Sequence, residues 1–159
     1  MPITIRYAQK GDEAAIAELL VAIHTQHAEG RPDLFGKGRA KYSAEEVLSL
    51  FGKETEPIFV AESDTLGVVG YAICQIITAK NPALSDFTTL YLDDLNVSAL
   101  ARRQGVGTML LDACRREARE RGCYNLTLNV WAFNEGAIRF YEANGFRVQR
   151  TILEDIIAP

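Results

Sequence analysis

Short runs rich in β-branched, aliphatic and aromatic residues recur along the chain and predict strands. In the first and fifth runs apolar and polar positions alternate, as on a strand with one buried face. The second and third runs are separated only by the polar turn Ser63-Asp64-Thr65, which predicts an antiparallel hairpin. The predicted strands are Ile3–Ala8, Pro57–Glu62, Leu66–Ile77, Thr88–Val97, Asn125–Val130 and Phe146–Leu153.

Helical spacing of apolar residues marks the segments between these strands. From Ile16 to Ile23, apolar residues recur at i, i+3, i+4 and i+7, which places them on one helix face. Ser43 and Glu46 have the spacing of a capping box. The predicted helices are one opening at Gly11-Asp12, one from Ser43 to about Phe51, Val106–Arg121 ended by Gly122, and Glu135–Ala143 between Asn134 and Asn144-Gly145. The segments Ala28–Lys41 and Asn81–Asp86 are predicted as loops.

The order of these elements predicts a mixed sheet. Strands joined by a hairpin are antiparallel, as in the first half of the chain, whereas strands alternating with helices, as in the second half, pair in parallel. We therefore expect an α/β (α+β layered) fold with about six or seven strands flanked by about four helices. No repeat, low-complexity tract or linker divides the chain, so residues 1–159 are predicted to form a single domain.

Composition narrows the classes of function. The 159 residues are 48% apolar and 24% charged, an ordinary balance for a globular protein. A net charge of -4 argues against non-specific binding to nucleic acid, which needs a basic surplus. No apolar run approaches the roughly 20 residues of a membrane span, and the N-terminus lacks the apolar core of a signal peptide. We expect a cytoplasmic protein whose partners are neither nucleic acid nor a membrane.

The three cysteines, Cys74, Cys114 and Cys123, are expected to be free thiols in a reducing compartment. Their odd number and irregular spacing do not fit a disulfide framework. The two histidines, His24 and His27, lie far from them in the sequence, so no metal site is predicted. None of the thiols is expected to act as a nucleophile.

A strand, a basic loop and a helix follow one another around Gly105, in the sequence LNVSALARRQGVGT. The first turn of a helix has backbone N–H groups without intrahelical partners, and glycines let a bulky anion approach the backbone. Arg102 and Arg103 add positive charge. The loop lacks the Lys-Ser/Thr end of a P-loop and the GxGxxG spacing of a dinucleotide site. Taken alone, it predicts either an anion site or a simple turn with solvated arginines.

Two motifs together resemble the GCN5-related N-acetyltransferases. The first, R-x-x-G-x-G, is present as Arg102-Arg103-Gln104-Gly105-Val106-Gly107, after the strand that ends at Val97. The second is an asparagine near a helix start followed by Phe-Tyr and Gly-Phe, here Asn134, Phe140-Tyr141 and Gly145-Phe146. The resemblance spans roughly Pro57 to Phe146. It implies an acyl-CoA N-acyltransferase fold and transfer of an acetyl group from acetyl-CoA to an amine.

The resemblance also implies where acetyl-CoA, the co-substrate, would bind. Its pantetheine arm would lie between the strands Thr88–Val97 and Asn125–Val130 and pair with the first like an added strand. Its pyrophosphate would lie on backbone N–H groups of the basic loop. Asn134 would contact the arm, although a simple helix cap explains this residue equally well. The implied coenzyme-binding residues are Leu95, Asn96, Val97, Arg102, Arg103, Gln104, Gly105, Val106, Gly107, Thr108, Asn134, Ala137 and Tyr141.

Catalytic roles follow from the same resemblance. Tyr141 would protonate the leaving thiolate, since a phenol pKa of about 10 is in range of the thiol value of about 8.5; a core tyrosine beside Phe140 is the alternative. The Tyr-Leu-acid-acid run ending in Asp93 and Asp94 is similar to the diamine (polyamine) acetyltransferase branch, where the first acid is the proposed base. Asp93 is therefore favoured, with Asp94, a water or direct attack left open. Because side chains alternate along a strand, the two aspartates are expected on opposite faces.

In this family the first helices and the loop after them shape the acceptor pocket. That places His27, Glu29, Arg31 and Phe35 with Asp93 around the acceptor, unless the loop is a solvated surface segment. The leading prediction is direct transfer, in a ternary complex, to a primary amine of a small molecule. The alternatives are a protein N-terminus or lysine as acceptor, and a non-catalytic CoA-binding regulatory module. Many members of the family are dimers, so a homodimer is a further hypothesis.

Overall fold

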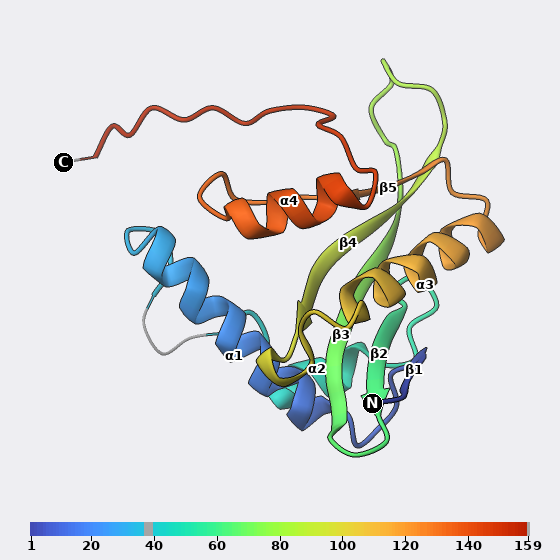
Figure 1. Cartoon of the computed structure of the whole chain (residues 1–159). Helices are drawn as coiled ribbons and strands as arrows, with labels where there is room; N and C mark the ends of the chain where they lie inside the picture. The colour runs from blue at the N-terminus through green and yellow to red at the C-terminus, as the bar shows by residue number, and fades with distance from the viewer. Residues whose placement is uncertain (37–39, 159) are drawn as a thin grey trace. The chain divides into compact units, whose positions relative to one another are not determined.

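A five-stranded sheet organises the computed structural model, which describes residues 1–36 and 40–158. The strands lie in the order β1-β2-β3-β4-β5 (Figure 1). Pairing is antiparallel from β1 to β4 and parallel between β4 and β5, which confirms the predicted mixed α/β sheet. The elements in chain order are β1 (Ile3–Tyr7), α1 (Glu13–Gly30), α2 (Ala44–Leu50), β2 (Ile58–Ser63), β3 (Gly67–Thr78), β4 (Thr88–Val97), the short 3-10 helix η1 (Ala99–Ala101), α3 (Val106–Glu120), β5 (Asn125–Leu128) and α4 (Glu135–Ala143).

The chain divides into two compact units, Met1–Asn129 and Val130–Pro159. The first contains the whole sheet with α1, α2 and α3, and the second contains α4 and the chain that follows it. Two helix starts use the caps that the sequence predicts. Ser43 and Glu46 form the reciprocal hydrogen bonds of a capping box at α2, and Asn134 Oδ1 accepts from the Ala137 N–H at α4. Across residues 1–36 and 40–158, no helix is both long and apolar enough to cross a membrane.

Helices cover both faces of the sheet in the first unit (Figure 1). Tyr71 and Ile73 of β3 lie in a buried cluster with residues of α1 and α2. Cys74 follows on the opposite face, where its Sγ lies 3.6 Å from Sγ of Cys114 on α3. The two faces thus have separate apolar cores, one under α1 and α2 and one under α3. The buried members of the first core are Ile16, Leu20, Val47, Ile58, Val60, Tyr71 and Ile73.

The three cysteines are free thiols, as predicted. Cys74 and Cys114 are buried, and the hydrogen bond between them, together with burial, raises the pKa of the Cys74 thiol. Burial also raises the pKa of Cys123. Because the thiolate is the nucleophilic form, these pKa shifts agree with a packing role.

Two elements, α1 and β5, end two or more residues from their predicted ends. α1 runs to Gly30, so its last turn includes residues that were predicted to begin a loop at residue 28. The N–H of Arg31 still bonds to the carbonyl of His27 at 2.9 Å, and this helical bond holds the last turn despite the glycine. The rest of that predicted loop includes residues 37–39, which lie outside the described residues. β5 ends at Leu128 rather than at Val130.

The strand predicted over residues 146–153 is absent, so the described part of the chain has five strands in its sheet rather than six or seven. After α4 the described chain is extended and contains neither helix nor strand (Figure 1). Val148, Ile152 and Leu153 are 79%, 83% and 90% exposed. A strand forms only where a neighbouring strand completes its hydrogen bonds, and among the described residues none does so here. The prediction of this strand, which rested on the alternation of apolar and polar residues, is therefore wrong.

Asn96 on β4 is 9% exposed and links two elements. Its Nδ2 donates to the carbonyl of Leu19 on α1, and its Oδ1 accepts from the Val97 N–H, both at 2.9 Å. Asn96→Ala leaves these two groups without their partners, so we expect the free energy of unfolding, measured in urea, to fall by about 2 kcal/mol. Asn81→Ala, in an exposed loop, is the control and is expected to change it by less than about 0.5 kcal/mol. An equally small effect of Asn96→Ala would contradict the link.

Candidate active site

β4 and β5 separate partway along β4. Their parallel register runs from Thr89 opposite Asn125 to Leu92 opposite Leu128, where β5 ends. β4 continues to Val97, and over this stretch β3 is its only strand neighbour in the described sheet. The edge of β4 that faces away from β3 is therefore open from residue 93 to residue 97.

Backbone groups on this open edge bond to nearby side chains. The N–H of Ser98 donates to a β3 carbonyl at 2.7 Å, so by alternation the backbone groups of Val97 and Leu95 point away from β3. The Val97 N–H donates to Asn96 Oδ1 at 2.9 Å, and the Val97 carbonyl accepts from Arg102 Nε at 3.2 Å. The open edge thus presents a donor and an acceptor that suit a strand-like ligand. Such a ligand would replace the Asn96 and Arg102 side chains as hydrogen-bond partners of the Val97 backbone.

The loop after β4 leads into the N-terminus of α3. Gly105 is the N-cap residue with φ of 75°, a left-handed conformation that glycine adopts readily. The first N–H that bonds within the helix is that of Met109, to the Gly105 carbonyl at 2.9 Å. The N–H groups of residues 106–108 come before it and have no intrahelical acceptor. Of the loop residues, Arg102, Arg103, Gln104 and Gly105 are exposed, Gly107 and Thr108 are half-buried, and Val106 is buried. This helix start beside two arginines fits a phosphate-bearing ligand.

A β-bulge places Asp93 and Asp94 on the same side of the sheet. Ile73 of β3 pairs with Asp94 and Cys74 pairs with Leu92, so Asp93 is the extra residue of the bulge. The ammonium of Lys41 lies 2.8 Å from Asp93 Oδ1 and 4.0 Å from Asp94 Oδ2. The prediction that the two aspartates face opposite sides is therefore wrong, because the bulge interrupts the alternation on which it rested.

Two tyrosines complete the cluster around the aspartates. The Tyr42 hydroxyl donates to Asp93 Oδ2 at 3.1 Å, and the Tyr71 hydroxyl donates to Asp94 Oδ1 at 2.9 Å. Both aspartate side chains are 10% exposed, whereas the Lys41 side chain is 41% exposed. Lys41 therefore reaches the carboxylates from the solvent side. We call these five residues the Asp93–Asp94 cluster.

The pKa values of two members of this cluster are shifted. Burial raises the pKa of Asp94, against the opposing effects of the Tyr71 hydrogen bond and the Lys41 charge. Burial and the charge of Asp93 raise the pKa of Tyr42 to about 12, so its phenol stays protonated and donates to Asp93. The cluster contains one more carboxylate than ammonium, which favours a second cation there.

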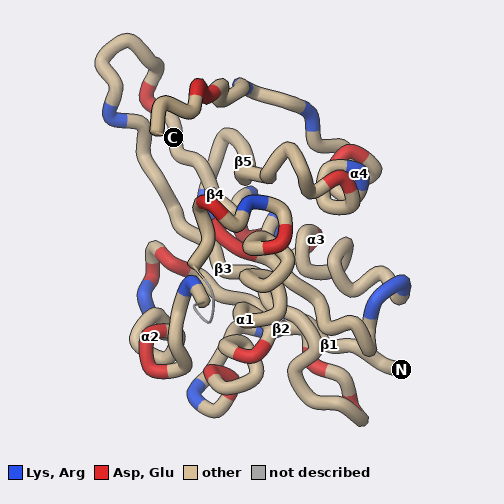
Figure 2. The backbone as a smooth tube through the Cα atoms, turned by 90° about the vertical axis from the view of Figure 1, so that its left-hand side faces the viewer, with Lys and Arg blue, Asp and Glu red and all other residues tan. Residues whose placement is uncertain are grey.

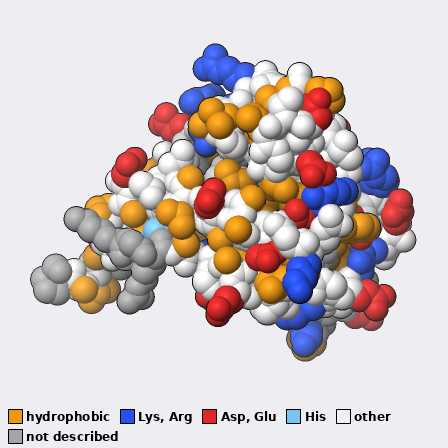
Figure 3. All heavy atoms as spheres, turned by 90° about the horizontal axis from the view of Figure 1, so that it is seen from below, with side chains coloured by type: hydrophobic (Ala, Val, Ile, Leu, Met, Phe, Trp, Pro, Cys, Tyr) orange, Lys and Arg blue, Asp and Glu red, His pale blue; other side chains and the backbone are white. Residues whose placement is uncertain are grey.

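The predicted acceptor residues lie on the end of α1 and on the chain after it. His27 and Phe35 have ring centroids 5.2 Å apart, and a histidine is visible among apolar side chains at the surface in Figure 3. Burial lowers the pKa of His27, and the charges of His24 and Lys41 add to this effect. Glu29 is exposed. Arg31 forms a bidentate ion pair with Asp33 at 2.9 and 2.8 Å, so its charge is balanced locally.

The helices on this face of the sheet are acidic. α1 and α2 contain five glutamates and no lysine or arginine, and Figure 2 shows red positions along both. The five are Glu13, Glu18, Glu29, Glu45 and Glu46. A surface with this sign of charge attracts a cationic ligand.

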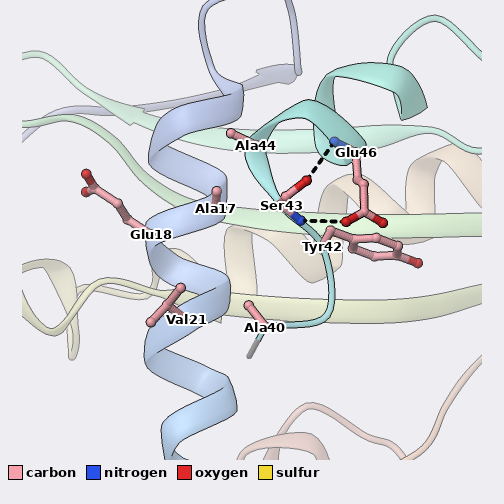
Figure 4. Close-up of a pocket in the computed structure, with 8 residues that line it drawn as sticks. All are labelled: Ala17, Glu18, Val21, Ala40, Tyr42, Ser43, Ala44 and Glu46. Carbon is pink, nitrogen blue, oxygen red and sulfur yellow. Dashed lines mark hydrogen bonds between the residues drawn. The ribbon is translucent and has the colours of Figure 1, made fainter. Parts of the chain in front are cut away.

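A pocket between α1 and the start of α2 adjoins the cluster through Tyr42 (Figure 4). Its walls are mostly apolar, with Glu18 on α1 and the capping-box residue Glu46 as its charged groups. The lining residues are Ala17, Glu18, Val21, Ala40, Tyr42, Ser43, Ala44 and Glu46. This pocket was not predictable from the sequence, because it is formed by packing between two helices.

Three of the predicted residues belong to the second unit. Asn134 and Ala137 form the cap of α4, with the Ala137 N–H donating to Asn134 Oδ1 at 3.1 Å. The Tyr141 ring lies against its neighbours Phe140 and Phe146, at centroid distances of 5.1 and 5.5 Å. Asn134 therefore acts as the helix cap that was one of its two interpretations.

Sequence reasoning missed Lys41, Tyr42 and Tyr71. Each reaches the aspartates from a distant part of the chain, and Lys41 is 52 residues from Asp93. The available signal was indirect: two carboxylates on a central strand need partners of opposite charge or hydrogen-bond donors. That requirement does not say which lysine or tyrosine supplies them.

The sequence model of the Acetyltransferase (GNAT) family matches residues 12–146. The match includes the open edge of β4, the glycine-containing loop before α3 and α4. The chain therefore belongs to the Acetyltransferase (GNAT) family, and its mixed sheet with flanking helices is the acyl-CoA N-acyltransferase fold.

Solved structures share this fold. The tetramutant of the BH1408 protein from Bacillus halodurans is 24% identical with a TM-score of 0.91, and the match covers 97% of this chain and 99% of that one. A transcriptional regulator from Bacillus halodurans C-125 is 21% identical, with coverage of 98% and 100% and a TM-score of 0.75. The aminoglycoside N-acetyltransferase AAC(6')-Iy in complex with CoA is 17% identical, with coverage of 99% and 96% and a TM-score of 0.72. At these identities the likeness concerns the fold.

The raised pKa of Asp94 predicts a pH-dependent effect of Asp94→Asn. The pKa of this carboxyl is about 3.9 in the unfolded chain and is raised in the folded chain. Stability therefore falls as the pH rises from the unfolded-state pKa through the folded-state pKa, because the buried carboxyl ionises. The amide removes this charge and keeps an acceptor for the Tyr71 hydroxyl. We expect the thermal midpoint to rise at pH 7 and to be unchanged at pH 3. Asp112→Asn, at an exposed carboxylate on α3, is the control; a lower midpoint for Asp94→Asn at pH 7 would contradict the assignment.

Proposed function

We propose that this protein transfers the acetyl group of acetyl-CoA directly to a primary amine of a small molecule, within a ternary complex. The observation that carries the proposal is the position of a primary ammonium, that of Lys41, on Asp93 beside the open edge of β4. Membership of the Acetyltransferase (GNAT) family supports the reaction type. A protein of the same fold, AAC(6')-Iy, forms a complex with the bisubstrate analog CoA-S-monomethyl-acetylneamine, and this supports an amine-bearing small molecule as the acceptor.

The acceptor in this proposal is cationic. Lys41 Nζ donates to both Asp93 Oδ1 and the Asp93 carbonyl, at 2.8 and 3.3 Å. The ammonium of an acceptor would form the same bonds once Lys41 moves aside, which its exposed side chain permits. The glutamates of α1 and α2 favour acceptors with more than one amine, such as a polyamine or an aminoglycoside.

The coenzyme in this proposal lies along the open edge of β4 and on the start of α3. Pantetheine would pair with the backbone of residues 95–97 as an added strand. Arg102, which now donates to the Val97 carbonyl, would be released toward the pyrophosphate on the N–H groups of residues 106–108. Asn134, Ala137 and Tyr141 are assigned to the coenzyme by the family resemblance.

Three proton transfers accompany the reaction. The acceptor ammonium, held by Asp93, must lose a proton before its nitrogen attacks the thioester carbonyl. We assign this proton to Asp94, the alternative to the Asp93 that the family resemblance favours, because burial raises the pKa of Asp94 and its carboxylate lies on the same side of the sheet as that of Asp93. The thiolate released from coenzyme A takes its proton from Tyr141, and the resulting phenolate takes up the second proton that the acceptor nitrogen loses as the amide forms. Orientation of amine and thioester in one complex supplies much of the rate enhancement.

An acceptor screen tests the proposal. The protein is mixed with acetyl-CoA and a panel of polyamines, aminoglycosides, and peptides with a free N-terminus or a lysine, and release of free thiol is followed. We expect turnover with small polyamines or aminoglycosides. Turnover on peptides alone would favour a protein acceptor. Binding of acetyl-CoA without turnover on any amine would favour a regulatory module, and failure to bind acetyl-CoA would refute the proposal.

Tyr141→Phe separates chemistry from coenzyme binding. Loss of the phenolic proton is expected to lower kcat by about 100-fold, the lower end for a general acid, while the Kd for acetyl-CoA stays unchanged. Stopped-flow thiol release and calorimetric titration measure the two quantities. Tyr124→Phe, at a tyrosine that is 80% exposed, is the matched control and should leave both unaltered. Wild-type kcat in Tyr141→Phe would refute the general-acid role.

Lys41→Met tests whether Lys41 occupies the position of the acceptor ammonium. Without this competitor, KM for a cationic acceptor should fall about fivefold, equivalent to about 1 kcal/mol, the upper end for an exposed ion pair. The kcat should change little, because the proposed proton-transfer groups, Asp94 and Tyr141, are unchanged in this variant. Lys10→Met, at another exposed lysine, controls for the lost surface charge. A higher KM in Lys41→Met would show instead that Lys41 helps to bind the acceptor.

A further inference from the structure

Glu56, just before β2, has a carboxylate oxygen that is shielded from solvent but lacks a hydrogen bond. This oxygen, Oε2, has no hydrogen-bond partner among residues 1–36 and 40–158. The ammonium of Lys53 lies 3.4 Å from it as an ion pair, and the Lys53 side chain is 52% exposed. Buried carboxylate oxygens nearly always accept hydrogen bonds, so Glu56 is suited to accept one from a ligand.

The segment before β2 continues the sheet and fixes the direction of the Glu56 side chain. Two N–H groups of β3, those of Cys74 and Ile76, donate to the carbonyls of residues 57 and 55 at 3.0 and 2.8 Å. The antiparallel pairing of β2 with β3 therefore extends back to residue 55. Because side chains alternate along an extended chain, Glu56 and Ile58 point to the same face of the sheet.

The same face holds the aspartates of the site. Ile58 pairs with Ile73 of β3, and Ile73 pairs with Asp94 of β4, so the three side chains share the face that α1 and α2 cover. Glu56 is two strands away from β4, which corresponds to about 10 Å at the usual spacing between strands. Glu56 is also one of three carboxylates whose charges raise the pKa of Tyr42, after the larger effect of burial.

Glu56 and Asp93 have the same arrangement of charge. Each carboxylate is paired with the ammonium of a partly exposed lysine, Lys53 on Glu56 and Lys41 on Asp93. In the proposed function Lys41 occupies the position of the acceptor ammonium. By the same reasoning Lys53 occupies the position of a second ammonium. One flexible molecule with two primary amines fits both positions.

We propose that Glu56 binds the second ammonium of a linear diamine whose first ammonium lies on Asp93. This inference rests on the proposed function, because it takes the amine on Asp93 to be the one that is acetylated. It also narrows the class of acceptor. The slim end of an alkyl chain fits an oxygen that is shielded from solvent, whereas the bulky rings of an aminoglycoside do not. The amine on Glu56 keeps its charge, so the product is a monoacetylated diamine.

Putrescine and butylamine, which have the same alkyl chain and differ by one amine, test this inference. Steady-state kinetics with acetyl-CoA measure how strongly the full chain prefers putrescine, as the ratio of kcat/KM for the two amines. Glu56→Gln should lower this preference about tenfold, because the distal ammonium loses a charged acceptor. Lys53→Met should raise it about threefold, because it removes the competing ammonium.

Glu54→Gln is the matched control, since it removes the same charge from an exposed position two residues away. It should change the preference by less than about twofold. An unaltered preference in Glu56→Gln overturns the inference, and so does an equal loss in Glu54→Gln. Circular dichroism checks the fold of each variant. If Glu56→Gln does not fold, Lys53→Met at its exposed position decides, and a preference that does not rise overturns the inference.

A binding measurement separates this inference from the proposed reaction. Calorimetric titration with putrescine needs no turnover, and its Kd should rise about tenfold in Glu56→Gln. Turnover of both amines with an equal putrescine Kd in wild type and Glu56→Gln overturns the role of Glu56 and leaves the proposed acetyl transfer standing. Putrescine binding that weakens in Glu56→Gln, without acetylation of either amine, supports Glu56 as an ammonium site and counts against the transfer alone.

Discussion

Parallel pairing between β4 and β5 stops at Leu92, and the next residue, Asp93, is the extra residue of a bulge against β3. The end of the pairing opens one edge of β4, where backbone donors and acceptors face away from β3. The bulge brings two successive carboxylates to the same side. With unbroken pairing and regular alternation, β4 would be an ordinary central strand with neither an open edge nor two aspartates on one side.

Two nearly buried carboxylates on a central strand are costly unless charge and hydrogen bonds compensate them. Tyr71 comes from the adjacent strand, whereas Lys41 and Tyr42 come from the segment just before α2. That segment ends at Ser43, whose capping box fixes the start of α2. A helix cap that was predicted from the sequence thus helps to position Lys41 and Tyr42, although the roles of these two residues were not predicted.

The order of elements was predictable because alternation, turns and caps are local properties; the Ser63–Thr65 turn and the Asn134 cap are examples. The strand predicted at residues 146–153 failed because pairing depends on a neighbour that a local pattern does not specify. The bulge at Asp93 was invisible for the same reason, and so the relative orientation of the two aspartates was wrong. Lys41 required a contact across 52 residues, which spacing and composition do not contain.

The side-chain amide of Asn96 contacts two elements. Its nitrogen donates to the Leu19 carbonyl of α1, and its oxygen accepts from the N–H of Val97 on β4. A ligand that accepts a hydrogen bond from the Val97 N–H would release Asn96 Oδ1, while Nδ2 of the same amide still donates to α1. Because the amide group of Asn96 is planar and rigid, a rotation that changes one of these hydrogen bonds also changes the other. The side chain thereby couples the geometry of the open edge of β4 to the position of the first helix.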